Sequence, residues 1–126
     1  MESALQKYQS VGVSEVDFWF KTAPVDAFPI DGGACVKYAD MQIAVFHFAR
    51  KNAWYATQNL CPHKLEMVLS RGLLGDEAGT PKVSCPLHKR TFSLETGENL
   101  QGSEEAIAVF PVKIEEGFVY IGLRNP

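Results

Sequence analysis

Two short segments of the chain each combine a cysteine with a histidine. The first is Cys61-Pro62-His63, and the second, after 21 intervening residues, is Cys85-Pro86-Leu87-His88. Thiolate sulfur and imidazole nitrogen are ligands of zinc and of iron–sulfur clusters. The proline in each segment stiffens its loop, which lowers the entropy lost when the ligands are fixed around a metal. The spacing therefore predicts a metal centre with two sulfur and two nitrogen ligands.

Three interpretations of this pattern compete. The first is that two structural cysteines and two surface histidines match by chance. The second is a structural Cys₂His₂ zinc site, although zinc sites usually take both cysteines from one segment and both histidines from the other. The third is a [2Fe–2S] centre in which one iron carries two thiolates and the other carries two imidazoles. If each segment gives one ligand to each iron, each must hold one cysteine and one histidine, as is found here.

Further segments extend the pattern beyond the four ligands. They are Leu69-Ser70-Arg71-Gly72, the lysines after both histidines (Lys64 and Lys89), and Phe92-Ser93-Leu94-Glu95-Thr96-Gly97-Glu98. With them, the sequence from about Trp19 onward resembles the small subunits of bacterial NAD(P)H-dependent assimilatory nitrite reductases, which are Rieske-like proteins. Generic Rieske loops have glycine after each ligand histidine, where this chain has the two lysines.

The resemblance implies an all-β fold, with a Rieske-like β-sandwich or barrel base and a small, loop-rich cluster-binding subdomain at about 59–92. It implies a Rieske-type [2Fe–2S] cluster, with Cys61 and Cys85 on one iron and His63 and His88 on the other. It also implies an oxidoreductase partner, a large nitrite reductase subunit with FAD, a [4Fe–4S] cluster and sirohaem. That subunit would reduce nitrite to ammonium in nitrate assimilation, and this chain would transfer electrons to it or stabilise it.

Two other functions stay open at this point. One is a free-standing Rieske ferredoxin that donates electrons to an oxygenase, and the other is a cluster-free regulatory binding module. No Ser-His-Asp arrangement and no glycine-rich phosphate loop is recognisable in the sequence. We therefore expect no catalytic residues on this chain, and we expect catalytic turnover on the partner.

Length and composition predict one ordinary globular domain. The chain has 126 residues, of which 46% are hydrophobic and 21% are charged, and this is enough for a single core. We expect an N-terminal extension over 1–16 and one domain over 17–126. Short strands are predicted at 17–21, 34–38, 41–46, 53–57 and 91–94, with a closing hairpin of 107–114 and 118–123. The stretch between 59 and 90 is predicted to be irregular, because Gly72, Gly75, Gly79 and Pro81 interrupt it.

Charge, hydropathy and cysteine content argue against a nucleic-acid-binding, membrane-spanning or secreted protein. The net charge is −3, whereas a nucleic-acid-binding domain is normally basic. The longest apolar stretch, 43–46, is far too short for a membrane span, and no signal peptide is visible. Three cysteines do not make a secreted disulfide framework, so we expect a cytoplasmic protein.

Two further residues and one charged segment bear on the predicted site. Cys35 is predicted to be a buried, inert thiol, and His47 a strand histidine with a satisfied hydrogen bond. Segment 61–90 has a net charge of +2, which suggests a docking surface for the partner. Its basic residues are Lys64, Arg71, Lys82, Lys89 and Arg90.

Overall fold

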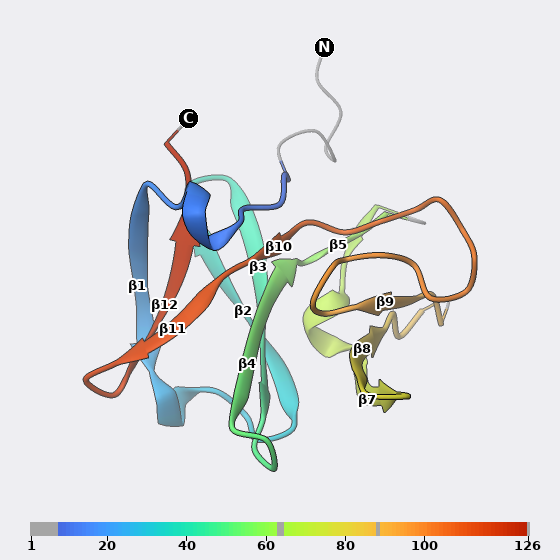
Figure 1. Cartoon of the computed structure of the whole chain (residues 1–126), viewed down its shortest axis with the longest axis horizontal. Coiled ribbons are helices and arrows are strands. Elements are labelled where there is room, and N and C mark those ends of the chain that lie inside the picture. Colours follow the sequence, from blue (N-terminus) through green and yellow to red (C-terminus); the bar gives the residue numbers. More distant parts are fainter. Residues whose placement is uncertain (1–7, 63–64, 88, 126) are drawn as a thin grey trace.

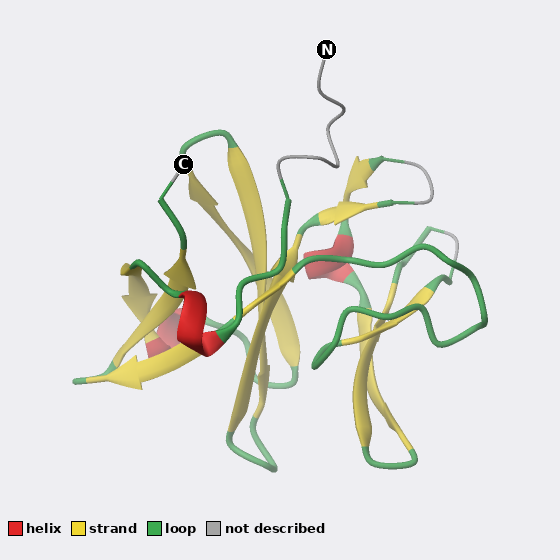
Figure 2. Ribbon diagram, turned by 45° about the horizontal axis from the view of Figure 1, so that its top comes forward, coloured by secondary structure: helices red, strands yellow, loops and turns green. Residues whose placement is uncertain are grey.

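A computed structural model describes residues 8–62, 65–87 and 89–125. Two antiparallel sheets face each other and form the base, and a smaller group of strands lies at one side of it (Figures 1 and 2). The first sheet has the order β1 (Phe18–Pro24), β12 (Phe118–Leu123), β11 (Val112–Glu115). The second has the order β10 (Val109–Phe110), β4 (Ala53–Gln58), β3 (Met41–Phe48), β2 (Gly32–Tyr38). The expected all-β class is confirmed.

The smaller group, here called the side subdomain, consists of two further antiparallel sheets. One has the order β7 (Leu73–Glu77), β8 (Thr80–Ser84), β9 (Thr91–Ser93), and the other pairs β5 (Leu60–Cys61) with β6 (Glu66–Met67). The short 3₁₀ helices are η2 (Val13–Glu15), η3 (Val25–Ala27) and η4 (Leu69–Arg71). Among the described residues, no helix is long and apolar enough to cross a membrane.

Strand β3 belongs to two hydrophobic cores at once. Ile43 and Val45 are fully buried in the core between the two base sheets, while Ala44 and Phe46 are fully buried in a second core under the side subdomain. Side chains alternate between the two faces of a strand, so a strand covered on both faces needs an uninterrupted apolar run. The apolar stretch 43–46 of the sequence is this doubly covered strand.

Two predicted elements are wrong in detail. The expected strand at 107–114 is divided at Pro111, with β10 pairing with β4 in one sheet and β11 with β12 in the other. The stretch predicted to be irregular contains the β7–β8 hairpin, whose turn residues Ala78 and Gly79 both have positive φ, 52° and 90°. Two such residues fit the right-handed twist of a tight hairpin, so the glycine marks a turn between paired strands here.

The described part of the expected N-terminal extension, residues 8–16, packs onto the base. Tyr8 and Val11 are 6% and 8% exposed and belong to the core of the base. The Tyr8 hydroxyl accepts a hydrogen bond from Gln42 N at 3.0 Å, and Val11 N donates one to Val109 O at 3.0 Å. This segment therefore covers the base rather than extending away from it.

Candidate metal centre

The two candidate metal-binding segments are hairpin loops built on the same backbone frame. Cys61 is the last residue of β5 and pairs with Glu66 of β6, while Cys85 follows β8 and its N–H donates to Arg90 O at 2.7 Å. Four residues therefore separate the closing pair in each loop. We call these loop one (Cys61–Glu66) and loop two (Cys85–Arg90).

A second backbone hydrogen bond gives both loops the same turn. Leu65 N donates to Cys61 O at 2.8 Å, and Lys89 N donates to Cys85 O at 2.9 Å. The donor residue is left-handed in both loops, with φ of 56° at Leu65 and 57° at Lys89. This region favours glycine, and Lys89 adopts it at the position where the sequence pattern of generic Rieske loops has glycine. Loop one places the left-handed residue at Leu65, one position after Lys64.

Both candidate sulfur ligands are buried among the same group of apolar residues. Cys61 and Cys85 are 0% and 1% exposed and belong to the second hydrophobic core, together with Phe46 and Phe92. No disulfide joins any of the three cysteines. Two thiols at equivalent positions of two similar loops suit a metal with soft sulfur ligands. The donor set therefore fits an iron–sulfur centre.

The two candidate nitrogen ligands, His63 and His88, lie outside the described residues, as does Lys64. Within the described part of the chain, no group of three or more histidine, cysteine or acidic side chains is positioned to hold a metal ion. The structure therefore brings together the sulfur half of the predicted ligand set, in one core. The ligand set as a whole stays a prediction.

Two buried amide side chains anchor loop one to the base, and sequence reasoning did not identify them. The Gln58 side chain connects the start of β5 to the residue before β10. Its Nε2 donates to Leu60 O at 2.6 Å, and its Oε1 accepts from Ala108 N at 2.8 Å. Asn59 Oδ1 accepts from Ser70 N at 2.7 Å, which holds η4. Both residues are 2% exposed. Buried amides must be hydrogen-bonded, so the polar pair that precedes Leu60 and Cys61 was the available signal.

The outer surfaces of the two loops are partly apolar. Leu65 of loop one is 53% exposed and Leu87 of loop two is 48% exposed. Lys89 is also exposed, but Arg90 is half-buried, and its Nε lies 3.9 Å from Glu105 Oε1. Because Glu105 lies outside segment 61–90, the charge count of that segment overstates its basic character.

The prediction that Cys35 is buried is wrong. His47 does lie in a strand, β3, but within the described part of the chain the hydrogen bond predicted for it is not found at its Nε2 atom. Cys35 is exposed, and Asn59 Nδ2 lies 3.6 Å from its sulfur. Partial burial of this sulfur raises the pKa of the Cys35 thiol above its ordinary value, and Lys37 opposes that shift. His47 stacks on Trp54 with ring centroids 3.9 Å apart. Its Nε2 atom is buried and has no hydrogen-bond partner among the described residues.

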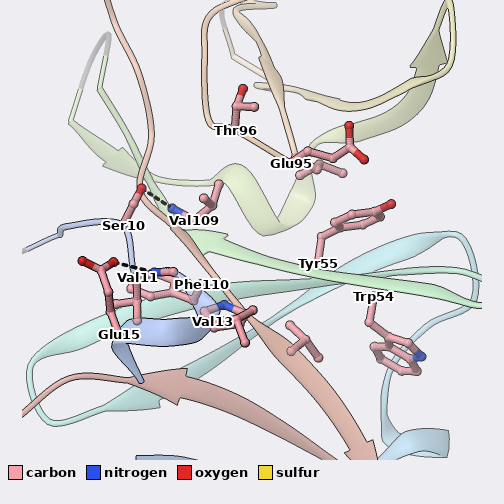
Figure 3. A pocket seen from close by; sticks show the side chains of 14 residues that line it. Ser10, Val11, Val13, Glu15, Trp54, Tyr55, Glu95, Thr96, Val109 and Phe110 are labelled. Atoms are coloured by element: carbon pink, nitrogen blue, oxygen red, sulfur yellow. Dashed lines mark hydrogen bonds between the residues drawn. The ribbon is translucent and has the colours of Figure 1, made fainter. Parts of the chain in front are cut away.

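A hollow of about 490 Å³ lies between the N-terminal segment, the start of β4 and the loop after β9 (Figure 3). Its polar lining is largely occupied by the backbone, since Ser10 Oγ accepts from Val109 N and Glu15 accepts from Gly12 N. Trp54 and Tyr55 form an aromatic part of its wall.

Comparison with known proteins identifies the family. The profile of the Rieske-like [2Fe–2S] domain matches residues 18–122. The chain belongs to the Rieske-like [2Fe–2S] domain family. The matched range includes both base sheets and the side subdomain, so this Rieske-like domain comprises nearly all of the described structure. The cofactor of this family is a [2Fe–2S] cluster.

Individual relatives of this Rieske-like domain fall into two groups. The nitrite reductase [NAD(P)H] large subunit of Klebsiella oxytoca is 40% identical over 104 residues, which are 82% of this chain and 11% of that one. The 3-phenylpropionate/cinnamic acid dioxygenase ferredoxin subunit of Photorhabdus laumondii is 33% identical over 98 residues, 77% of this chain and 87% of that one. The chain thus spans about a tenth of the Klebsiella relative.

Among solved structures, the nitrite reductase [NAD(P)H] small subunit from Erwinia carotovora has the same fold. It superimposes with a TM-score of 0.73 at 28% identity, and the match covers 86% of this chain and 83% of that one. The Rieske-like domain is therefore similar both to a separate small subunit and to a segment of a much longer nitrite reductase chain.

Proposed function

We propose that this domain is the small, Rieske-type subunit of an NAD(P)H-dependent nitrite reductase, and that it passes electrons within that enzyme in nitrate assimilation. When bound, the [2Fe–2S] cluster supplies a one-electron redox centre. The observation that carries the proposal is the similarity to nitrite reductase both as a separate small subunit and as a segment of a large chain. A domain that is fused to an enzyme in one organism is expected to bind the corresponding chain when it is separate in another.

For the metal centre we propose Cys61 and Cys85 as ligands of one iron and His63 and His88 as ligands of the other. The matching backbone hydrogen bonds of loop one and loop two support this division. Each loop also begins with a buried cysteine and contains one histidine. We also propose that the cluster-binding subdomain extends over about 59–92 of a single domain at 17–126. The apo fold would keep both sulfurs away from water until the cluster is bound.

The partner would be a large chain that carries the sites of NAD(P)H oxidation and nitrite reduction, in the cytoplasm. Exposed Leu65 and Leu87, one from each loop, and exposed Lys89 support docking through the tip of the side subdomain. An apolar centre with a charged neighbour is typical of surfaces that bind a protein partner. Docking at this surface would also bring the redox centre close to the partner.

A second candidate function is that of a ferredoxin serving an oxygenase, which the similarity to the Photorhabdus ferredoxin subunit favours. Anaerobic mixing experiments separate the two. The reduced protein is mixed with a sirohaem-containing large chain and nitrite, and the visible absorbance of the cluster is followed. We expect reoxidation that requires both components, and none with Cys61→Ser. Reoxidation only by an oxygenase would contradict the proposal and favour the ferredoxin.

A further inference from the structure

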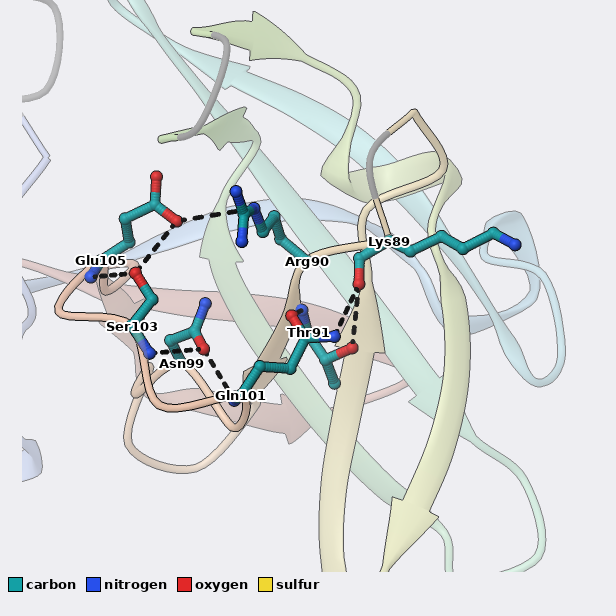
Figure 4. A network of polar contacts seen from close by, with 7 residues as sticks. All are labelled: Lys89, Arg90, Thr91, Asn99, Gln101, Ser103 and Glu105. Atoms are coloured by element: carbon teal, nitrogen blue, oxygen red, sulfur yellow. Dashed lines mark hydrogen bonds and ion pairs between the residues drawn. The ribbon is translucent and has the colours of Figure 1, made fainter.

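A side chain from outside the two cluster loops braces the closing end of loop two. Gln101 Nε2 donates a hydrogen bond to Lys89 O at 3.1 Å, and Gln101 Oε1 accepts one from Thr91 N at 3.2 Å (Figure 4). The two backbone groups lie on either side of Arg90. The side-chain amide thus offers the donor and the acceptor that a residue of a neighbouring strand would offer.

The brace is itself held in place by its own loop. Asn99 Oδ1 accepts hydrogen bonds from Gln101 N at 2.7 Å and from Ser103 N at 3.3 Å (Figure 4). Leu100 N donates to Thr91 O at 2.8 Å, so the backbone next to Gln101 is also tied to β9. The Gln101 side chain therefore reaches loop two from a fixed position.

Lys89, one of the two residues that the Gln101 side chain contacts, has the least favourable backbone conformation among the described residues of loop two. It holds a left-handed φ of 57° without being glycine, and such a conformation persists only where its surroundings enforce it. One restraint is its own N–H, which donates to Cys85 O. The other is its carbonyl, which accepts hydrogen bonds from Gln101 Nε2 at 3.1 Å and, at the longer distance of 3.4 Å, from Thr91 Oγ1. His88 directly precedes Lys89 in the sequence.

We propose that Gln101 is a positioning residue for the cluster, which holds the backbone next to His88 in the conformation that metal binding requires. This inference rests on the proposed ligand assignment. Loop one is anchored by Gln58 and Asn59 in the core, whereas Gln101 supports loop two from an exposed position. Gln101 is exposed, so its side chain can be changed without opening the core.

The test compares Gln101→Met with the wild type in the reconstituted full-length protein. The substitution removes both hydrogen bonds, adds no charge and keeps a similar side-chain length. Gln9→Met is the matched control, because Gln9 is also exposed but lies in the N-terminal segment. Three quantities are measured: the EPR spectrum of the reduced cluster, the half-life of the cluster in the presence of a chelator, and the melting temperature of the apoprotein.

For Gln101→Met we expect broadened EPR lines and cluster loss that is about five to thirty times faster, the range that two lost hydrogen bonds of low to average net strength would produce. The apoprotein should melt within about 2 °C of wild type, since exposed side chains away from the core contribute little to stability. Gln9→Met should match wild type in all three measurements. A wild-type spectrum and half-life for Gln101→Met would overturn the brace. If the unsubstituted protein itself binds a cluster that has no nitrogen ligands, the ligand assignment is overturned, and the role of Gln101 with it.

Discussion

Gly33 of β2 packs closely against η4, and replacing it with alanine should push these two elements apart. A Cβ at this position would lie 2.5 Å from Ser70 O in η4 and 2.7 Å from the Phe46 ring. Neither neighbour can move easily, because Phe46 is fully buried and Ser70 N is held by Asn59. Overpacking of this kind costs about 1–3 kcal/mol, and we expect the upper part of that range, about 2–3 kcal/mol, because one clash is with backbone.

The matched control is the preceding residue of the same strand. A Cβ at Gly32 would meet nothing closer than Pro29 Cγ at 3.4 Å, which is a van der Waals contact. Both substitutions reduce the entropy of the unfolded chain equally, so the difference between them isolates the clash. For a chain of this length, 2–3 kcal/mol corresponds to a melting temperature about 8–12 °C lower for Gly33→Ala than for Gly32→Ala.

The assay is thermal and urea unfolding of both apoprotein variants, followed by circular dichroism. Gly33→Ala should also bind less iron on reconstitution, because η4 is tied through Asn59 to the chain just before Cys61. A difference in unfolding free energy below about 0.5 kcal/mol between the two variants would refute the close packing of β2 against η4.

Three further predictions concern charged and titratable side chains. Because partial burial raises the pKa of the Cys35 thiol, its alkylation by iodoacetamide should rise at higher pH than that of a free cysteine; a profile at the ordinary pH would contradict this. Lys89→Glu should slow association with the large chain and flatten its dependence on ionic strength, whereas Lys37→Glu on the base should not; equal slopes for both variants would exclude docking at the tip. The hydrogen bond from Lys51 at 2.7 Å lowers the pKa of Asp76, so its contribution to stability is present above the ordinary carboxyl pKa and fades as pH falls through the lowered value; Lys51→Ala should raise that pKa in an NMR titration, and an unchanged value would show that the ion pair does not persist in solution.

The base sheets could be predicted from sequence because their signals are local. The β2–β3 hairpin follows from two apolar segments around the short turn at 39–40, and the predicted ranges agree with the strands to within a few residues. Pro111 carried a signal that was not used: its missing N–H and fixed φ favour a break between two strands. The β7–β8 hairpin is harder to predict because glycines are typical of irregular loops as well as of tight turns, and Gly79 belongs to a tight turn here.

For the candidate metal centre, the sequence identified the residue types but not their support. The alternation of cysteine and histidine identified both loops, because metal ligation imposes residue types directly. The matching turns of the two loops depend on a positive φ at Leu65 and at Lys89. Neither residue type favours that conformation, so the sequence does not predict it. The contact of Gln101 with loop two joins residues 10 and 12 positions apart through side-chain hydrogen bonds, and no periodicity in the sequence encodes such a pair.

Pulsed EPR of the reduced protein, reconstituted anaerobically and labelled with ¹⁵N-histidine, tests the proposed ligand assignment most directly. We predict two irons and two sulfides per chain, and two coordinated imidazole nitrogens whose couplings change with the isotope. His63→Ala and His88→Ala should each abolish this signal, and His47→Ala should leave it intact. A cluster without coordinated nitrogen, or one zinc ion per chain in place of iron, would contradict the assignment of Cys61, His63, Cys85 and His88 as the ligands of a Rieske centre.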